Sequence, residues 1–340
     1  LQRRDFTVNA MAYNAEYGLV DPYGGKNDLK DKIIRCVGNP DTRFNEDALR
    51  ILRALRFASV YGFSIEENTS KSIFKNADLL KNIATERVIS EFLKLICGKD
   101  AVKILDAYRE TIAVIIPEIT VMFNFNQNNI HHSYDLWQHT LTALGTIEPN
   151  PILRMTMLLH DIGKPSVKTT DNSGQSHFQG HQLESKKIAD RILHRLRLPS
   201  DFINKTLLLI EYHDVRFNGS KKLMKKVMNV LGTDLTKQLL EVEYADISAQ
   251  SEYQREEKLG YLKTAKTHLN EIIKDNECFK LSQLDINGKD VLNLGVKEGR
   301  DVGNILDYLL MLVVDANVPN KKSILISKAK EYIYGNQINK

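Results

Sequence analysis

From residue 35 onward, apolar residues recur at the helical spacing through almost the whole chain, with only short polar interruptions. In "NEDALRILRALRFASVYG", Leu49, Leu52 and Leu55 form an apolar ridge, and Asn45 is the predicted N-cap. Thr85 is predicted to cap a helix in "ERVISEFLKLICG". Further helices are predicted at 135–146, 151–162, 180–197, 202–213, 221–232 and 233–274, with a loop at 166–180. The pattern therefore predicts a mainly α fold.

The first part of the chain follows a different pattern. Short apolar stretches at 7–20 lead into Asp21-Pro22 and Gly24-Gly25, which predict a turn because proline fixes φ and glycine accepts a positive φ. The segment "KIIRCVG" is predicted to form a short strand. Strands are therefore expected mainly near the start of the chain.

Length and composition exclude several classes of protein. The 340 residues allow two or three domains, and 42% apolar with 26% charged residues is typical of a soluble globular protein. No run of about 18 apolar residues could span a membrane, and no secretory signal is recognisable. The three cysteines, Cys36, Cys97 and Cys278, are expected to be reduced thiols in a cytoplasmic protein. A net charge of +4 permits an anionic partner without requiring one.

One predicted helix carries charged residues at every third position, namely Asp47, Arg50, Arg53 and Arg56. Such a line can be a solvated face with an Asp–Arg pair. The alternative is a nucleotide site, because a guanidinium suits phosphates and base edges, and a carboxylate accepts from an exocyclic amine. In that hypothesis Asp47 and Arg50 contact the Watson–Crick edge of cytosine or adenine. Arg53 and Arg56 would then face the triphosphate.

A series of histidines and aspartates follows at intervals that each suit one helix and its return: His139, His160-Asp161, His181, His213 and Asp246. A single histidine on an apolar helix is usually only packed. Several imidazoles with carboxylates instead indicate a site for Mn, Fe, Co, Ni or Mg. Lys164 would be placed to neutralise negative charge there, although a surface lysine after a helix end is the alternative.

The order of "RRDFTVNAMAY", "DPYGG", "RFNEDALRILRALRF" and "ERVISE" resembles the class II CCA-adding tRNA nucleotidyltransferases and their bacterial poly(A) polymerase relatives. The resemblance implies that Arg4 contacts the nucleotide and that Asp47 and Arg50 select CTP and then ATP. It also implies that Arg53 and Arg56 hold phosphates. The implied partners are tRNA, CTP and ATP.

This family uses Mg²⁺ for nucleotidyl transfer, held by carboxylates upstream of the RRDF motif and after a "GGxVRD" element. Neither occurs in this chain, and Asp5 and Asp21 do not form that pair. Two-metal phosphoryl transfer requires such carboxylates. We therefore expect an N-terminally truncated chain that begins inside the transferase head and does not transfer nucleotides.

The histidine series also resembles the HD-domain metal phosphohydrolases, whose pattern is H…HD…H…H…D. The resemblance implies one metal held by His139, His160, Asp161 and Asp246, and a second held by His181 and His213 with Asp161 bridging. Asp161 and Lys164 are the implied catalytic residues. Phosphatase and 2',3'-cyclic phosphodiesterase activities accompany such a domain in some CCA-adding enzymes. His131 and His132 are interpreted as loop or substrate-facing residues.

The C-terminal part has two further features. Lys221, Lys222, Lys225 and Lys226 are predicted on one side of a helix, as a solvated face or as contacts to a phosphate backbone. Four glycines, Gly288, Gly295, Gly299 and Gly303, are expected in loops and helix caps. The resemblance assigns this segment to a tail that binds the tRNA elbow.

The predicted fold is mainly α: a remnant of an α/β nucleotidyltransferase head at 1–31, a helical neck at 32–110, an all-α HD domain at 111–250 and a helical tail at 251–340. The leading hypothesis is a CCA-adding enzyme with an HD domain. The alternatives are a poly(A) polymerase, an HD phosphohydrolase as the only active part, and a non-catalytic RNA-binding fragment.

Overall fold

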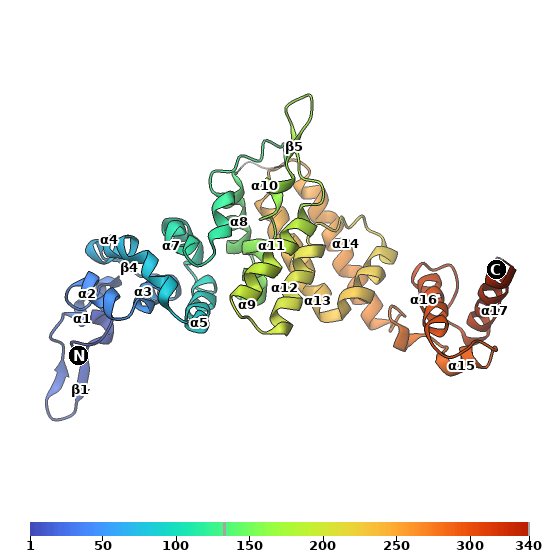
Figure 1. The fold of residues 1–340 in the computed structure, drawn as a ribbon, viewed down its shortest axis with the longest axis horizontal. Coiled ribbons are helices and arrows are strands. Elements are labelled where there is room, and N and C mark those ends of the chain that lie inside the picture. Colours follow the sequence, from blue (N-terminus) through green and yellow to red (C-terminus); the bar gives the residue numbers. More distant parts are fainter. Residues whose placement is uncertain (132–133, 339–340) are drawn as a thin grey trace. The chain divides into compact units, whose positions relative to one another are not determined.

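The computed structural model describes residues 1–131 and 134–338. It is mainly helical with a few short strands, which confirms the predicted fold class (Figure 1). The chain forms two compact units: Leu1–Asp214 with Glu241–Arg255, and Val215–Leu240 with Glu256–Lys340. No helix in the described residues is long and apolar enough to cross a membrane.

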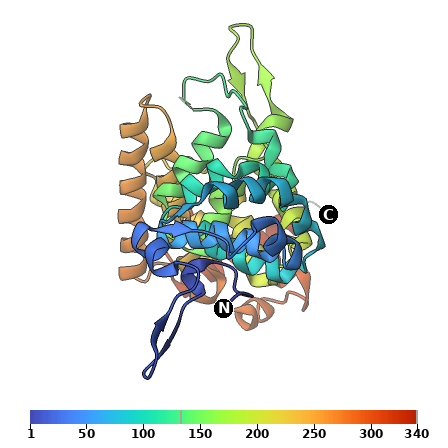
Figure 2. The same ribbon diagram turned by 90° about the vertical axis from the view of Figure 1, so that its left-hand side faces the viewer.

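The first unit begins with short strands. Antiparallel β1 (Ala12–Asn14) and β2 (Gly18–Val20) form a hairpin (Figure 2), and β3 (Ile33–Ile34) pairs in parallel with β4 (Ser64–Ile65). The predicted strand in "KIIRCVG" is thus confirmed over two residues. Asp21 accepts hydrogen bonds from the amides of Gly25 and Lys26, at 2.7 and 2.8 Å, and so caps α1 (Gly25–Asp31).

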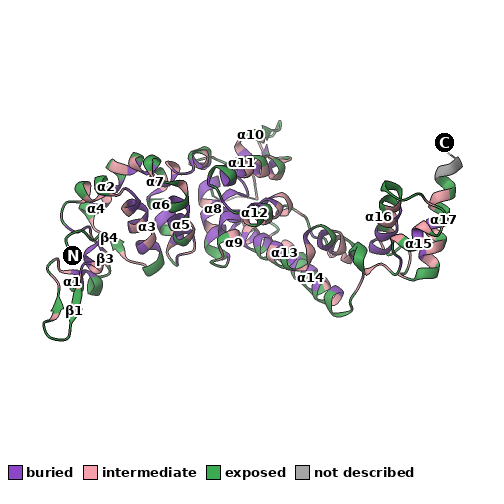
Figure 3. Ribbon diagram, turned by 60° about the horizontal axis from the view of Figure 1, so that its bottom comes forward, coloured by how far each residue is buried: buried purple, intermediate pink, exposed green. Residues whose placement is uncertain are grey.

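Helices build the rest of the first unit, and their buried faces form its core (Figure 3). In chain order they are η1 (Thr7–Asn9), α2 (Pro40–Glu46), α3 (Leu49–Tyr61), α4 (Glu67–Asn76), η2 (Ala77–Asn82), α5 (Thr85–Ile96), α6 (Ala101–Ala107), α7 (Arg109–Ala113), η3 (Pro117–Met122), α8 (Leu136–Thr146), α9 (Pro151–Leu159), α10 (Lys164–Val167), α11 (His181–Arg195) and α12 (Ser200–Tyr212). The predicted loop at 166–180 contains the antiparallel hairpin of β5 (Thr169–Thr170) and β6 (Ser176–His177).

Two predicted helix starts were wrong. Asn45 lies inside α2, a helix that the sequence interpretation missed, and Asn39 caps α2 by accepting from the amide of Thr42. Proline at the first helical position after Asn39 favours a helix start there. Thr85 is the first residue of α5 rather than its cap. Asp47 ends α2 in an extended conformation, so it does not share a helix with Arg50.

The second unit contains part of α13 (Lys221–Ala249), with α14 (Arg255–Lys274), η4 (Leu281–Gln283), α15 (Gly288–Leu292), α16 (Arg300–Val314) and α17 (Lys322–Ile338). Gly232 interrupts α13 with φ 72° and ψ 177°, which favours glycine. Residues 215–240 group with the tail segment, whereas the predicted HD–tail boundary lay at residue 250. Buried Val291, Leu309 and Leu325 belong to the core of this unit.

The four lysines at the start of α13 are bound to acidic side chains of their own unit. Lys221 and Lys225 lie 2.5 and 2.7 Å from the Glu277 carboxylate. Lys222 and Lys226 lie 3.2 and 3.1 Å from Asp315. Three of the four side chains, Lys221, Lys222 and Lys226, are still 34%, 47% and 40% exposed, so the lysines lie on a partly solvated, ion-paired face, and contact with a phosphate backbone stays a prediction.

The glycine-spaced segment is largely as expected. Gly288 is the first residue of α15, Gly295 is in a loop and Gly299 caps α16 with φ 127°. Gly303 is the exception, because it lies inside α16.

Candidate metal centre and nucleotide site

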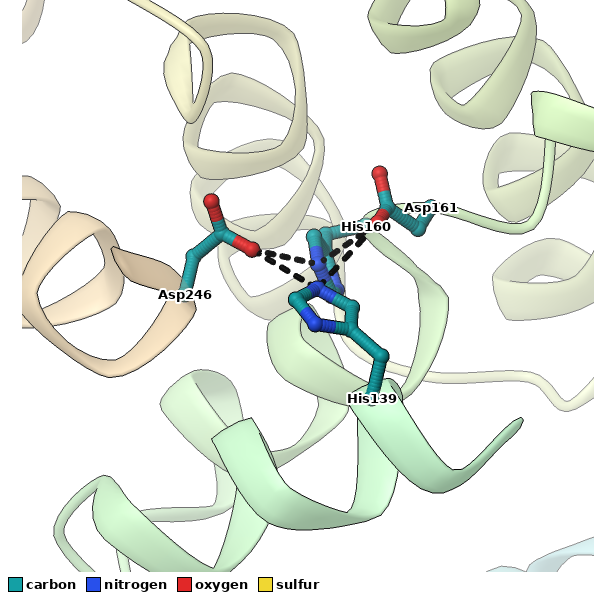
Figure 4. A group of neighbouring side chains, drawn as sticks. All are labelled: His139, His160, Asp161 and Asp246. Carbon is teal, nitrogen blue, oxygen red and sulfur yellow. Dashed lines mark hydrogen bonds and ion pairs between the residues drawn. The ribbon is translucent and has the colours of Figure 1, made fainter. Parts of the chain in front are cut away.

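Six side chains of the histidine series converge in the first unit. His139 is on α8, His160 and Asp161 end α9, and Asp246 is on α13 (Figure 4). The ligand atoms of these four residues all lie within 4.8 Å of one another. The same holds for the second set, Asp161 with His181 at the start of α11 and His213 at the end of α12. Asp161 belongs to both sets.

Local sequence explains how α9 ends so close to α11. Gly163 follows the His-Asp pair, and a Cβ at this position would lie 2.5 Å from the backbone nitrogen of Ser185. The amide of Gly163 also donates to the Ser185 hydroxyl at 2.9 Å. Only glycine allows this approach, which brings Asp161 beside the first turn of α11.

Each histidine of the series has its ring fixed by the backbone. The Nδ1 atoms donate to main-chain carbonyl oxygens: His139 to Ala249 at 3.3 Å, His160 to Met157 at 2.8 Å, His181 to Phe178 at 2.9 Å and His213 to Ile210 at 2.7 Å. A carbonyl can only accept, so Nδ1 carries the hydrogen. The Nε2 lone pairs of neutral rings then point into the cluster, as in metal-ligating histidines.

The two oxygens of the Asp161 carboxylate face different ligand sets. Its Oδ2 lies 3.2 Å from Nε2 of His160 and 3.5 Å from Nε2 of His139. Its Oδ1 lies 3.3 Å from Nε2 of His181 and 3.5 Å from Nε2 of His213. One oxygen toward each set is the arrangement that a bridging carboxylate requires.

The cluster is buried and negatively charged, so it requires a compensating cation. Asp161 is 1% exposed, and the Asp246 side chain is 15% exposed. Burial lowers the pKa of His160, but the charges of Asp161 and Asp246 outweigh it and raise the pKa to about 10. Burial raises the pKa of Asp161, yet His160 and Lys164 hold it well below its usual range. A proton on His160 or a divalent cation bound by the same atoms could supply the positive charge.

Two observations indicate that the histidine nitrogens and carboxylate oxygens of this cluster suit a divalent metal. In the described residues, Nε2 of His160 and Oδ1 of Asp161 are buried without a hydrogen-bond partner. The donor set of nitrogen and carboxylate oxygen suits transition metals or magnesium. The structure thus brings the six predicted ligands together, and metal binding itself stays a prediction.

Lys164 is part of the buried site. Its ammonium lies 2.6 Å from Oδ2 of Asp161, and its side chain is 7% exposed. The alternative of a surface lysine was therefore wrong.

Two side chains beside Asp246 were missed from the sequence. Gln250 donates to Oδ2 of Asp246 at 2.8 Å. Glu243 is buried, and burial together with Asp246 and Asp214 raises its pKa well above the ordinary range. Neither lies in a motif, although Glu243 and Gln250 are each within about one helical turn of Asp246, a spacing that could have indicated contact.

His131 lies in the loop before α8. Its ring centre is 5.0 Å from that of Tyr253, and its carbonyl accepts from the amide of Ser251. His132 lies outside the described residues.

The N-terminal motif packs on the arginine helix. Arg50 donates to the carbonyl of Arg3 at 2.9 Å, and Arg53 lies 2.7 Å from Asp5. Arg4 is exposed beside them. The structure therefore brings the RRDF motif and α3 together, as the family resemblance requires.

The expected Asp47–Arg50 pair is not formed. Asp47 pairs with Arg87 of α5 at 3.1 Å, and Arg50 pairs with Glu46 at 2.9 Å. Asp47 lies outside α3, and its Oδ1 accepts from the amide of Leu49, the first residue of that helix, at 3.1 Å. Arg56 lies 2.7 Å from the buried Glu91 of α5. The three arginines of α3 are therefore each paired with an acidic residue outside that helix.

The described residues near this motif form no further candidate metal cluster. Among the described residues, the groups that could hold a metal ion are the two sets that share Asp161, and neither includes Asp5 or Asp21. Asp5 is bound to Arg53, and Asp21 caps α1.

Fold and site together define a helical protein with a candidate histidine–aspartate metal centre and an arginine-rich candidate nucleotide site. Three family models match the chain: "Poly A polymerase head domain" at residues 1–35, "Probable RNA and SrmB- binding site of polymerase A" at 62–123, and tRNA nucleotidyltransferase domain 2 at 181–329. The chain belongs to the family of CCA-adding tRNA nucleotidyltransferases and poly(A) polymerases.

Individual relatives agree with this assignment. A CCA-adding enzyme of Ligilactobacillus salivarius is 29% identical over 98% of this chain and 71% of its own length. A multifunctional CCA protein of Legionella pneumophila is 32% identical over 67% of this chain, but only 58% of the relative is covered. The fold is similar to the crystal structure of the Bacillus stearothermophilus CCA-adding enzyme in complex with CTP, with a TM-score of 0.70 and 24% identity over 100% of this chain and 75% of that one.

Proposed function

We propose that this chain carries the nucleotide- and RNA-binding part of a CCA-adding tRNA nucleotidyltransferase together with a metal-dependent phosphohydrolase site. The observation that supports the first activity is the packing of the RRDF motif on α3, with Arg53 bound to Asp5. The observation that supports the second is Asp161, which directs one oxygen to each ligand set.

In the proposed transferase, Asp47 and Arg50 contact the base edge of CTP or ATP. Arg4, Arg53 and Arg56 contact the phosphates, because a guanidinium fork matches phosphate oxygens. Pairing with Asp5 and Glu91 fixes two of these side chains before the nucleotide binds. The helical second unit is proposed to bind tRNA.

Nucleotidyl transfer in this family requires Mg²⁺ held by carboxylates. Asp5 is bound to Arg53, Asp21 caps α1, and Asp28 accepts from the Thr7 hydroxyl, so these acids near the motif are engaged elsewhere. We therefore propose that these 340 residues bind nucleotide and tRNA but do not by themselves transfer nucleotides.

The proposed phosphohydrolase site lies at His139, His160, Asp161, His181, His213 and Asp246. A bound Mn, Ni, Co, Fe or Mg ion would lower the pKa of a water molecule and polarise a phosphate. Asp161 holds the two ligand sets together, and Lys164 neutralises charge on the phosphate oxygens. The proposed substrates are phosphomonoesters and 2',3'-cyclic phosphates at RNA 3' ends. The three free cysteines are consistent with a reducing compartment such as the cytoplasm.

Nucleotide binding distinguishes the family alternatives. Calorimetric titration of the chain with each of the four nucleoside triphosphates should show binding of CTP and ATP above that of GTP and UTP. Binding of ATP alone would favour poly(A) polymerase. Absence of all nucleotide binding alongside active phosphate hydrolysis would favour the phosphohydrolase as the only working part.

A further inference from the structure

A glutamine in the loop before α8 is buried against the candidate metal centre. Gln127 is 1% exposed, and both ends of its amide are used. Its Oε1 accepts from the Lys164 ammonium at 3.1 Å, and its Nε2 donates to the carbonyl of Tyr134 at 3.3 Å. Since lysine can only donate and a carbonyl can only accept, the orientation of the amide is determined.

The backbone around Gln127 is anchored on both sides. The carbonyl of Phe125 accepts from the amide of Leu136 at 3.0 Å, which ties the loop to the start of α8. The carbonyl of Asn128 accepts from the amide of Ser176 at 3.0 Å, which ties it to β6. The amide group of Gln127 is therefore presented by a fixed loop rather than by a free side chain.

The Lys164 ammonium lies close to three of the described side chains. Its Nζ lies 2.6 Å from Asp161, 3.1 Å from Oε1 of Gln127 and 5.6 Å from the ring centre of Phe178. A lysine side chain has four rotatable bonds, so a single ion pair does not by itself fix its ammonium. The hydrogen bond to Gln127 restrains the ammonium from a second direction, in addition to the ion pair with Asp161.

The chemistry of the amide also matters. A glutamine oxygen accepts a hydrogen bond without carrying a charge, whereas a glutamate there would add a second carboxylate beside the one of Asp161. Gln127 thus fixes the ammonium without adding a second carboxylate to the one of Asp161, so the ammonium keeps more positive charge to offset the negative charge of a phosphate.

We propose that Gln127 is a positioning residue for the hydrolytic site, which holds the Lys164 ammonium in place beside Asp161 without adding a second negative charge to it. This proposal rests on the proposed phosphohydrolase function. Gln127 acts through Lys164 and is not itself a catalytic residue.

The test compares four variants of the full chain on a 2',3'-cyclic nucleotide with Mn²⁺. Gln127→Met keeps the length of the side chain and removes the acceptor. The kcat should fall roughly ten- to a hundredfold, as expected for a lost hydrogen bond to a charged group. Gln127→Glu keeps an acceptor but should not keep full activity, since it places a second carboxylate on a lysine that Asp161 already pairs. In a Lys164→Met background, adding Gln127→Met should cause no further loss.

Two controls separate positioning from damage to the fold. Gln175→Met makes the same change in the adjacent hairpin, at a side chain that is only partly buried, and should leave kcat unchanged. Metal content by elemental analysis should be the same in wild type and Gln127→Met. Amine labelling of Lys164, followed by mass spectrometry, should be several-fold faster in Gln127→Met than in Gln175→Met, and this readout does not depend on activity.

The outcomes are distinct. Full activity and unchanged labelling of Gln127→Met would overturn the positioning role, as would additive losses in the double variant. Loss of metal from Gln127→Met would also overturn it, because the residue would then support the ligand set instead. Wild-type protein that binds metal without hydrolysing any phosphate ester would remove the proposed hydrolase function and this inference with it.

Discussion

The Nε2 atoms of His181 and His213 lie 3.2 Å apart, and each ring donates its Nδ1 hydrogen to a backbone carbonyl. Two neutral rings in this tautomer would direct lone pairs at each other inside a buried site. A cation or a proton must therefore lie between them and the nearby Oδ1 of Asp161. This geometry favours a second metal position beside the one bounded by His139, His160 and Asp246.

Metal stoichiometry tests the second position. His213→Ala removes one ligand of the second set only, so it should lower the bound metal from two ions per chain to one. His139→Ala should remove the first ion and nearly abolish hydrolysis. Elemental analysis of the purified variants measures both. Equal metal content in His213→Ala and wild type would show that only one metal binds.

Base selection tests the arginine helix. Asp47→Ala should reduce the preference for CTP and ATP, because a lost bidentate contact to a base is worth roughly 1–3 kcal/mol of discrimination. Binding of tRNA should change little. Competition binding with all four nucleotides measures the preference, and Asp78→Ala, an exposed ion-pair partner of Lys81, is the matched control. Unchanged selectivity among the four nucleotides would show that Asp47 does not contact the base and serves only as an ion-pair partner of Arg87.

Acid stability tests the contact between α2 and α4. Hydrogen bonds from Lys75, Ser72 and Asn76 lower the pKa of Asp41 to about 2. Because the folded pKa is depressed, its stabilising effect is present above the ordinary value near 3.8 and is lost as the pH falls toward 2. Asp41→Asn should therefore destabilise the protein at pH 5–6 and matter progressively less below pH 4. Urea unfolding across this range measures the difference, and a constant difference would contradict the assignment.

Glycine substitutions test the close approach of α9 and α11. Gly163→Ala places a Cβ 2.5 Å from the Ser185 nitrogen and 2.8 Å from the His181 carbonyl, so the backbone must shift. We expect a loss of about 1–3 kcal/mol of stability together with weaker metal binding. Gly303→Ala in α16 is the control, since nothing lies within 4 Å of its Cβ. That change should stabilise by about 0.5–1 kcal/mol. Similar unfolding temperatures and metal content for Gly163→Ala and wild type would argue against the steric account.

The sequence predicted those parts of the site that lie in local motifs. Helical spacing indicated the elements, and the intervals between His139, His160, His181 and His213 indicated residues that the fold brings together. Contacts between distant segments were not predictable. Arg87 pairs with Asp47 across 40 positions, and nothing in a single sequence marks that pair. Gln127 was missed because an isolated polar residue in a loop has neither period nor motif.

The second source of wrong predictions was a helix boundary that the sequence pattern did not reveal. The spacing of Asp47, Arg50 and Arg53 suggested one continuous helix, yet α2 ends at Glu46 and α3 begins at Leu49. Residues three apart are neighbours only while the helix continues. The ion pairs of Lys221 and Lys222 with Glu277 and Asp315 likewise depend on packing within the second unit.

The most direct test of the account is metal content measured alongside hydrolysis in one preparation. Wild-type chain and Asp161→Asn should be analysed for bound metal and assayed on a 2',3'-cyclic nucleotide with Mn, Ni, Co and Mg. The account predicts bound metal and hydrolysis in the wild type and loss of both in Asp161→Asn, because Asp161 serves both ligand sets. Wild-type protein with no bound metal and no hydrolysis under any of these ions would contradict it.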